Sequence, residues 1–326
     1  MVTKTFFGKT SQGSNIYAYR IENERRIAVT VLDYGATLQS VVLPHKGAHV
    51  DILLGYDSIA AYEQNDSYLG ASIGRYAGRI PDAIALIGSD AFPVTVNDGK
   101  NHLHGGRIGF DKRVWDAAIG EDSVTFSLRS PDGDEGFPGA MRCSAEYALS
   151  DDLLTLTYRG ISDRTTAWNP TNHGYWNLNG HDAGDARQHC LMIPAKRYVP
   201  VGSDLIPTGE DADVSGTRFD FLAMRTIDGE YDHCFVLSGG PIRLFGTRGI
   251  GMEISTDCKA VQFYTARYLS ERRGKGGAIY RPFGAVCLET EGRQAHRATP
   301  IPAESILTPG VENTRTTQFR FLFEED

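Results

Sequence analysis

A histidine lies in an unusual setting in the stretch NPTNHGYWNLNG, residues 169–180. His173 is surrounded there by amides, glycines and aromatic residues, with hardly any charge and no helical period. A neutral imidazole held among hydrogen-bonding amides can transfer a proton near neutral pH. The rings of Trp168, Tyr175 and Trp176 offer flat apolar faces of the kind on which sugar rings stack. A histidine in a glycine-rich turn is also a common core residue, so His173 alone defines no site.

Two further stretches carry groups that can do chemistry. GRYAGRI, residues 74–80, holds two arginines in a glycine-rich loop, where arginines often only brace the loop or lie in solvent. CLET, residues 287–290, places Glu289 after an apolar run, at the expected end of a strand. A glutamate in such a place is often simply exposed. The imidazole and the carboxylate together are the kinds of group that general acid–base catalysis uses.

A pair of histidines suggests a metal site, which the rest of the sequence does not support. His102 and His104 lie in NHLHGGRIGFDKRVW, residues 101–115, and a His-x-His pair on a strand would point to one face. No third ligand follows at a recognisable spacing, so we expect no metal. The five cysteines also share no close spacing, which excludes a CxxC zinc or redox site (Cys143, Cys190, Cys234, Cys258, Cys287).

Composition narrows the classes of partner and compartment. The chain has 326 residues, of which 41% are hydrophobic and 23% charged, as in an ordinary soluble globular protein. Its formal net charge of −8 argues against nucleic acid or an anionic membrane as partner. No apolar run approaches the ~18–20 residues that span a bilayer, and the first residues lack the apolar core of a signal peptide. Together with the odd number of cysteines, this predicts a cytoplasmic protein.

The elements that must position these groups are predicted to be strands. Alternating or β-branched runs at 27–32, 37–43, 94–96, 114–119, 123–128, 146–149, 153–158 and 317–323 are separated by turn residues. Helical periodicity is confined to one short segment, residues 58–64. With no linker or internal repeat, and with 36 Gly and 14 Pro, the chain is predicted to form a single domain, residues 1–326. We expect one large antiparallel sandwich or barrel whose loops carry the function.

Taken together, these stretches resemble, in order along the chain, the motifs of the aldose 1-epimerase (galactose mutarotase) family. GRYAGRI resembles the family's GR-x-A-N-R-I loop, and NHLHGG with GFDKRVW resembles its N-x-LHGG...GFDK-x-W block. The other matching blocks are SPDGDEGFPG, NPTNHGYWNLNG, YVPVGSDLIPTGE, YDH, VQFYT, CLET and LTPG. Nine blocks in register, covering most of the chain, make the resemblance specific.

The resemblance implies a fold and an activity. The fold is an all-β "super-sandwich", a large antiparallel β-sandwich, in agreement with the strands expected above. The activity is interconversion of the α and β anomers of a free monosaccharide, without metal or organic cofactor. Ring opening needs a base that takes the proton from the O1 hydroxyl and an acid that protonates the ring oxygen. The open aldehyde then rotates and recloses on its other face.

Residue roles follow from the matching motifs. Glu289 would be the base at O1 and His173 the acid at the ring oxygen. The other residues expected to bind the sugar are His104 near the ring oxygen, Arg79, Asp232, Gln262 and, as a stacking face, Trp176. The resemblance leaves three residues as structural: Arg75, His102 and His233, the last because it should point away from Asp232 on a strand.

Two departures from the family leave the preferred sugar open. Gly78 stands where many relatives have Asn, and EGRQAHRATPIP, residues 291–302, replaces their Gln and a following Trp-Pro-Asp. Galactose, glucose, a pentose, a deoxy sugar and a ketose all fit, and Arg293, His296 and Arg297 would suit an acidic or phosphorylated sugar. A sugar-binding sensor and, less favoured, a carbohydrate-cleaving enzyme are alternatives. The chain is expected to be a monomer or a homodimer.

Overall fold

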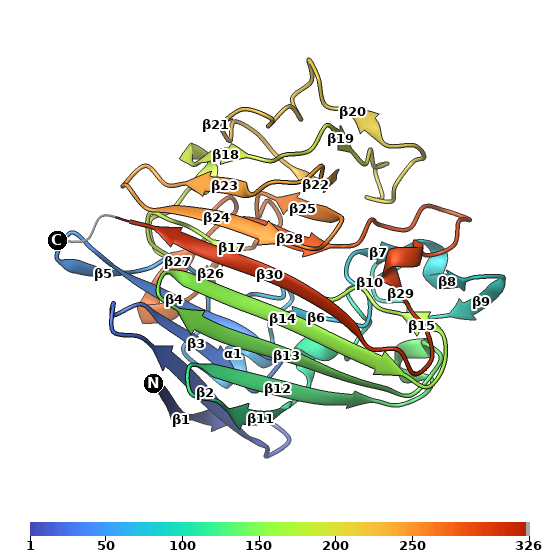
Figure 1. The fold of residues 1–326 in the computed structure, drawn as a ribbon, viewed down its shortest axis with the longest axis horizontal. Coiled ribbons are helices and arrows are strands. Elements are labelled where there is room, and N and C mark those ends of the chain that lie inside the picture. The colour runs from blue at the N-terminus through green and yellow to red at the C-terminus, as the bar shows by residue number, and fades with distance from the viewer. Residues whose placement is uncertain (324–326) are drawn as a thin grey trace.

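Three antiparallel sheets make up most of the computed structural model, which describes residues 1–323 (Figure 1). The largest has nine strands in the order β11 (Asp116–Ile119), β12 (Ser123–Ser130), β13 (Met141–Ser150), β14 (Leu153–Ser162), β30 (Asn313–Leu322), β24 (Gly251–Thr256), β23 (Ile242–Phe245), β18 (Cys190–Met192) and β21 (Arg225–Thr226). The predicted 146–149/153–158 hairpin is confirmed as β13–β14. The predicted C-terminal strand is confirmed as β30, which pairs with both β14 and β24.

Two smaller sheets cover the nine-stranded one. The six-stranded sheet has the order β17 (Tyr175–Trp176), β28 (Val286–Glu291), β25 (Ala260–Tyr264), β22 (Asp232–Val236), β19 (Arg197–Tyr198) and β20 (Ala212–Asp213). The five-stranded sheet has the order β1 (Val2–Lys9), β2 (Asn15–Glu22), β3 (Ala28–Leu32), β4 (Thr37–His45) and β5 (Ala48–Asp51). The predicted hairpin of residues 27–32 and 37–43 is confirmed as β3–β4.

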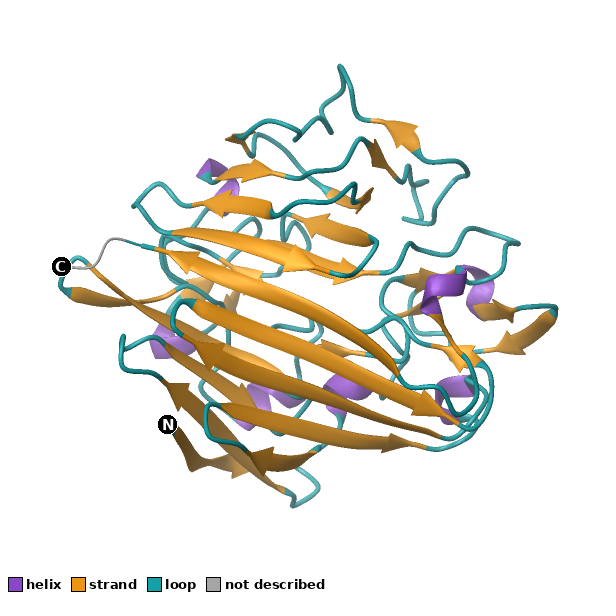
Figure 2. Cartoon of the chain, viewed as in Figure 1, coloured by secondary structure: helices purple, strands orange, loops and turns teal. Residues whose placement is uncertain are grey.

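Aromatic contacts between the sheets define the core. The Trp176 ring of the six-stranded sheet lies 5.3 Å from Phe319 of β30, and Tyr19 of the five-stranded sheet lies 5.4 Å from Phe126 of β12. All four rings belong to one buried hydrophobic cluster. The nine-stranded sheet is therefore the common layer against which both other sheets pack (Figure 2). This arrangement confirms the predicted all-β sandwich, whereas the single domain stays a prediction.

Short elements connect the sheets. Five two-stranded ribbons pair β7 (Arg79–Ile80) with β10 (His102–Leu103), β6 (Ser72–Ile73) with β16 (Thr171–Asn172), β8 (Ile84–Ile87) with β9 (Asp90–Pro93), β15 (Thr166–Ala167) with β29 (Ile306–Leu307), and β26 (Arg272–Arg273) with β27 (Ile279–Tyr280). The predicted helix is confirmed as α1 (Ile59–Glu63), which begins after Ser58, whose hydroxyl accepts a hydrogen bond from the Ala61 amide. The strand predicted at 94–96 is wrong, since β9 ends at Pro93.

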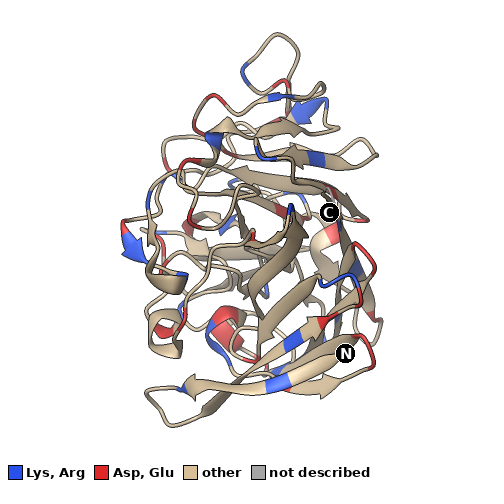
Figure 3. Cartoon of the chain, turned by 90° about the vertical axis from the view of Figure 1, so that its left-hand side faces the viewer, with Lys and Arg blue, Asp and Glu red and all other residues tan. Residues whose placement is uncertain are grey.

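Single turns of 3-10 helix complete the described elements. They are Pro81–Ala83, Phe110–Lys112, Asp134–Gly136, Ala186–Gln188, Lys275–Gly277 and Ala303–Ser305. Charged residues of both signs are scattered over strands and loops (Figure 3). Within residues 1–323, no helix has both the length and the apolar character needed to cross a membrane.

Candidate active site

One face of the six-stranded sheet gathers polar side chains, because successive residues of a strand point to opposite faces. In the antiparallel register Gln262 lies opposite Glu289, Asp232 opposite Tyr264, and Tyr175 opposite Cys287. Directly opposed residues share a face. The face that results carries Tyr175, Asp232, Gln262, Tyr264, Glu289 and Glu291, and all six line one cavity of about 400 Å³.

Loops close the cavity around this sheet face. Arg79 begins β7 and His104 directly follows β10, while Tyr68, Leu205 and Gln294 come from separate loops. The hollow is within the ~300–1,000 Å³ range of small-molecule sites and has charged and aromatic walls. A pyranose-sized ligand fits this description.

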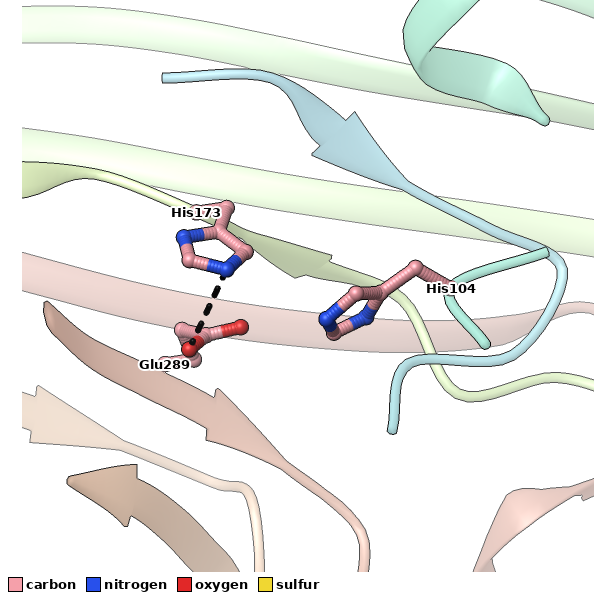
Figure 4. Close-up of side chains that lie close together, drawn as sticks. All are labelled: His104, His173 and Glu289. Carbon is pink, nitrogen blue, oxygen red and sulfur yellow. Dashed lines mark ion pairs between the residues drawn. The ribbon is translucent and has the colours of Figure 1, made fainter. Parts of the chain in front are cut away.

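His173 is fixed at the cavity wall by its backbone and by a neighbouring ring. Its amide donates to the carbonyl of Ala71, and its carbonyl accepts from the amide of Gly70, both at 2.9 Å. The imidazole stacks on Tyr175, with ring centroids 5.0 Å apart and planes 8° apart. These contacts leave one edge of the imidazole turned toward Glu289 (Figure 4).

The amides around His173 hold the neighbouring loops together. Asn169 accepts a hydrogen bond from the amide of Gly292, next to Glu291, and its side chain donates to the carbonyl of Ala77 in the arginine loop. Asn172 donates to the carbonyl of Gly70 at 2.7 Å. The stretch 169–180 therefore links the segment that carries the carboxylates to the loop that carries Arg79.

An imidazole and a carboxyl group meet inside the cavity. His173 Nε2 lies 3.7 Å from Glu289 Oε1, and their side chains are only 6% and 3% exposed (Figure 4). Neither His173 Nδ1 nor Glu289 Oε2 has a hydrogen-bond partner among the described residues. Unpartnered buried polar atoms are costly unless a ligand satisfies them, so this pair is suited to meet a polar ligand.

Burial favours the uncharged forms of both groups. It lowers the pKa of His173 to about 4 and raises the pKa of Glu289 well above its usual value. The negative charges of Glu291 and Asp232 raise the pKa of Glu289 further, whereas the positive charge of Arg79 lowers it. Both shifts favour a neutral imidazole beside a protonated carboxyl, and His173 Nε2 and Glu289 Oε1 are close enough to exchange the carboxyl proton after a small movement.

His104 is held in a defined tautomer. Its Nδ1 accepts a hydrogen bond from the amide of Gly78 at 3.2 Å, and its own amide donates to the Gly78 carbonyl. Burial lowers its pKa well below the usual value. A neutral ring whose Nδ1 accepts carries its proton on Nε2, so His104 can donate a hydrogen bond from that atom.

The same tautomer argues against a metal ion. Potential ligand atoms of His104, His173 and Glu289 lie within 4.8 Å of one another. A metal at Nε2 of His104 would require the ring proton to move to Nδ1, where it would face the N–H of Gly78. The hydrogen bond from the Gly78 amide therefore opposes metal binding by His104, although the three residue types would suit a metal.

Arg79 and Asp232 lie at the cavity wall with partners that orient them. The Arg79 Nε donates to Asp98 at 2.7 Å. Asp232 accepts a hydrogen bond from Gln262 at 2.6 Å, while burial raises the pKa of its carboxyl. The structure thus brings six predicted site residues to one cavity: Glu289, His173, Arg79, His104, Asp232 and Gln262.

The prediction that Trp176 offers a stacking face to the sugar is wrong. Its indole is 1% exposed, packs in the core against Phe319 and does not line the cavity. Because Tyr175 and Trp176 are consecutive in β17, only one of them can face the cavity, and that one is Tyr175. Glu289 also differs in place, since it lies within β28 rather than at its end.

The residues left as structural lie outside the cavity. The buried Arg75 guanidinium donates to Ser130 and to the carbonyls of Pro131 and Pro138, so it braces the loop 131–138. His102 is 0% exposed and its Nδ1 lies 2.8 Å from the carbonyl oxygen of Thr95. His233 packs against Phe219, away from the face that carries Asp232.

Sequence reasoning missed several cavity residues. Tyr264 and Glu291 lie two residues from Gln262 and Glu289, so strand alternation could have found them. Tyr68 and Gln294 lie in irregular segments, where no periodicity marks the residues that face the ligand.

Known proteins resemble this chain over almost its whole length. Residues 17–320 match the family model described as aldose 1-epimerase. Galactose mutarotase of Mus musculus is 35% identical over 338 residues, which cover 98% of both chains. Aldose 1-epimerase of Escherichia coli K12 is 34% identical over 329 residues, covering 93% of this chain and 94% of the other. The crystal structure of galactose 1-epimerase from Lactobacillus acidophilus superposes with a TM-score of 0.87 at 27% identity and covers 98% of both chains.

Proposed function

The chain belongs to the aldose 1-epimerase family, and from this premise we propose how its cavity interconverts the anomers of a monosaccharide. The enzyme is thus an isomerase, in agreement with the expectation from sequence. The observation that carries the proposal is the buried pair of His173 and Glu289 in a cavity of about 400 Å³. We infer that a pyranose binds with its O1 hydroxyl near Glu289 and its ring oxygen near His173.

The proposed reaction moves one proton at each side of the ring. Glu289 accepts the proton of the O1 hydroxyl while His173 donates its proton to the ring oxygen, and the C1–O5 bond breaks. The aldehyde rotates about C1–C2, and ring closure on the other face returns both protons. The O1 hydroxyl and the charge of Arg79 favour the carboxylate form of Glu289, so the shared proton passes to His173 when the sugar binds.

The other predicted residues bind and orient the sugar in this proposal. His104 donates from Nε2 toward the ring oxygen or a neighbouring hydroxyl, where negative charge develops during opening. Arg79 donates to a sugar oxygen, while Asp232 accepts a hydrogen bond from a sugar hydroxyl and is itself oriented by Gln262. Tyr175 supports the imidazole from behind through its stacked ring.

The charges of the wall favour a neutral sugar. Five carboxyl residues line the cavity, Asp66, Asp98, Asp232, Glu289 and Glu291, against a single arginine, Arg79. Of the basic residues expected to suit an acidic sugar, His296 does not line the cavity and the two arginines are engaged elsewhere. Arg293 pairs with Asp211 and Glu304, and Arg297 pairs with Asp82 and Asp204. A carboxylate or phosphate on the sugar would find no unpaired cation among the described residues of this wall, since Arg79 already pairs with Asp98.

Polarimetry of freshly dissolved α-sugars tests both points. We expect the enzyme to accelerate the relaxation of galactose or glucose over buffer. We expect kcat/KM for galacturonate or a sugar phosphate to be at least ~10-fold lower than for the neutral sugar, the effect of about 1.4 kcal/mol of repulsion. Preference for the acidic sugar would refute the assignment of substrate class. No acceleration of any hexose, pentose, deoxy sugar or ketose would refute the activity.

The rate should depend on pH in a bell-shaped manner, because the proposed reaction needs one group of the pair to be protonated and the other to be deprotonated. As pH falls toward the pKa of His173, about 4, the pair takes up a second proton and no base remains. As pH rises through the raised pKa of Glu289, the last proton leaves and no acid remains. We expect kcat/KM, which reports the pKa values of the free enzyme, to fall by at least ~10-fold by pH ~3. Circular dichroism at each pH separates this loss from unfolding, and an unchanged rate at pH ~3 in folded enzyme would contradict the pair's role.

We also propose that the enzyme works as one domain in the cytoplasm. The largest core cluster draws on all three sheets, all five cysteines are free, and one chain supplies every described residue that lines the cavity. A monomer and a homodimer are both compatible with this cavity. No observation favours the sensor or the carbohydrate-cleaving alternative.

A further inference from the structure

Gly78 leaves a space in the cavity wall that the side chain of a distant residue occupies. A Cβ at position 78 would lie 3.1–3.4 Å from the Nε2, Cδ and Cγ atoms of Gln294. Gly78 also has a φ of +80°, in the left-handed region. The amide of Gln294 thus stands where a side chain at position 78 would begin. Both residues line the cavity.

Hydrogen bonds fix the Gln294 amide in this place. Its Nε2 donates to Gln262 Oε1 at 3.1 Å and to Glu291 Oε1 at 3.2 Å. Gln262 in turn donates to Asp232 at 2.6 Å. Gln294 is 7% exposed, although the segment that carries it has no regular structure. A buried amide that bridges two residues of the sheet face is positioned by the fold and is not a loose loop side chain.

The two departures of this sequence from its family therefore meet at one point. Gly78 has no side chain to extend from the arginine loop, and Gln294 of segment 291–302 lies where that side chain would begin. Because Gln262 and Glu291 take both N–H donors of the Gln294 amide, its Oε1 remains to accept a hydrogen bond from a sugar hydroxyl. The neighbouring carboxyl of Glu291, whose pKa burial raises to about 8, adds a further polar group beside it.

We propose that Gln294 is a sugar-binding, specificity-determining residue that supplies, from the segment after β28, the amide that position 78 lacks. This rests on the proposed function, since the ligand is the neutral sugar that His173 and Glu289 act on. Gln294 contacts a hydroxyl remote from the acid–base pair, because it is attached to the wall through Gln262 and Glu291 and not through His173. Its loss should weaken sugar binding more than the chemical step.

Single variants at Gln294 test whether the amide is used. We expect Gln294→Ala to raise KM for the preferred neutral hexose by ~10-fold while kcat changes by less than ~3-fold. Gln294→Met keeps the volume without the hydrogen bonds and should raise KM similarly. His296→Ala, in the same segment but outside this cavity, is the matched control and should leave KM unchanged. A parental KM in both Gln294 variants would overturn the proposal.

Introducing an Asn at position 78 tests whether the Gln294 amide occupies the space that a side chain at position 78 would fill. Asn is tolerated at positive φ better than most residues, so Gly78→Asn is compatible with the backbone there. In the parent, Gly78→Asn would crowd Gln294 and raise KM by several-fold. In the Gln294→Ala background, the same substitution should lower the raised KM at least ~3-fold. Such a reversal of sign is typical of residues in contact. A purely structural role of Gln294 predicts no such rescue, and its absence, with thermal unfolding confirming a folded double variant, would overturn the proposal.

The outcomes also separate this proposal from the activity it depends on. If the parent enzyme accelerates anomer exchange and the Gln294 variants keep its KM, the proposed role of Gln294 is wrong and the proposed activity is still supported. A parent enzyme that accelerates no sugar removes both.

Discussion

Replacing Glu289 by Gln is expected to lower kcat by ~10³-fold while KM stays within ~3-fold of the parent value. The side chains have the same shape, and the pairing of Glu289 with Gln262 across β28 and β25 is made by backbone, so the strand remains in place. The amide can still hydrogen-bond a sugar hydroxyl but cannot take its proton. Polarimetry or the decay of one anomer's NMR signal measures the rate.

Glu291→Gln is the matched comparison for this variant. Glu291 lies on the same strand face, two residues from Glu289, and is equally buried. Because its carboxyl pairs with Gln294 rather than with His173, its loss should lower kcat by less than ~10-fold. Equal losses in the two variants would mean that the charge of the wall, and not a base at Glu289, accounts for the rate.

Replacing His173 by Asn is expected to lower kcat by ~10²–10³-fold. Asn retains a hydrogen-bonding group near Glu289 but has no titratable proton to give to the ring oxygen. It also loses the ring stacked on Tyr175, so a modest fall in thermal stability is expected, which unfolding curves would measure. The rate is measured well below the unfolding temperature.

His104→Gln is the comparison for His173→Asn. His104 acts in this account as a hydrogen-bond donor from Nε2, and Gln keeps an N–H donor of similar reach. Its kcat should fall by less than the kcat of His173→Asn, by ~10-fold or less. An equal or larger loss at position 104 would transfer the role of acid to His104.

Alternation along strands explains much of what the sequence could predict. The runs that became β3, β4, β13, β14 and β30 are bounded by turn residues, and their pairing follows from that pattern. The motif blocks placed Glu289, Asp232 and Gln262 on residues that share one sheet face. They also placed His173 beside Glu289, although 115 residues separate the two in the chain and only the three-dimensional fold brings them together.

The wrong prediction for Trp176 and the failure to predict Gln294 also have physical causes. In a two-residue strand such as β17 the pattern cannot tell which residue faces the cavity, and the larger ring of Trp176 went to the core, where burial gains most. Gln294 could not be found, because its place depends on a contact with Gly78 across the cavity and on no local period. Segment 291–302, which differs from the family motif, contributes Gln294 to the cavity.

The double variant E289Q/H173N tests the central claim most directly, because it asks whether the two groups act as one acid–base unit. Once either group is lost, the remaining one has no partner to complete the proton exchange, so the second substitution should cost little more. We predict that kcat of the folded double variant lies within ~3-fold of the slower single variant. Losses that multiply, so that the double variant falls to the product of the two single effects, would contradict the account, since they would mean that His173 and Glu289 act independently.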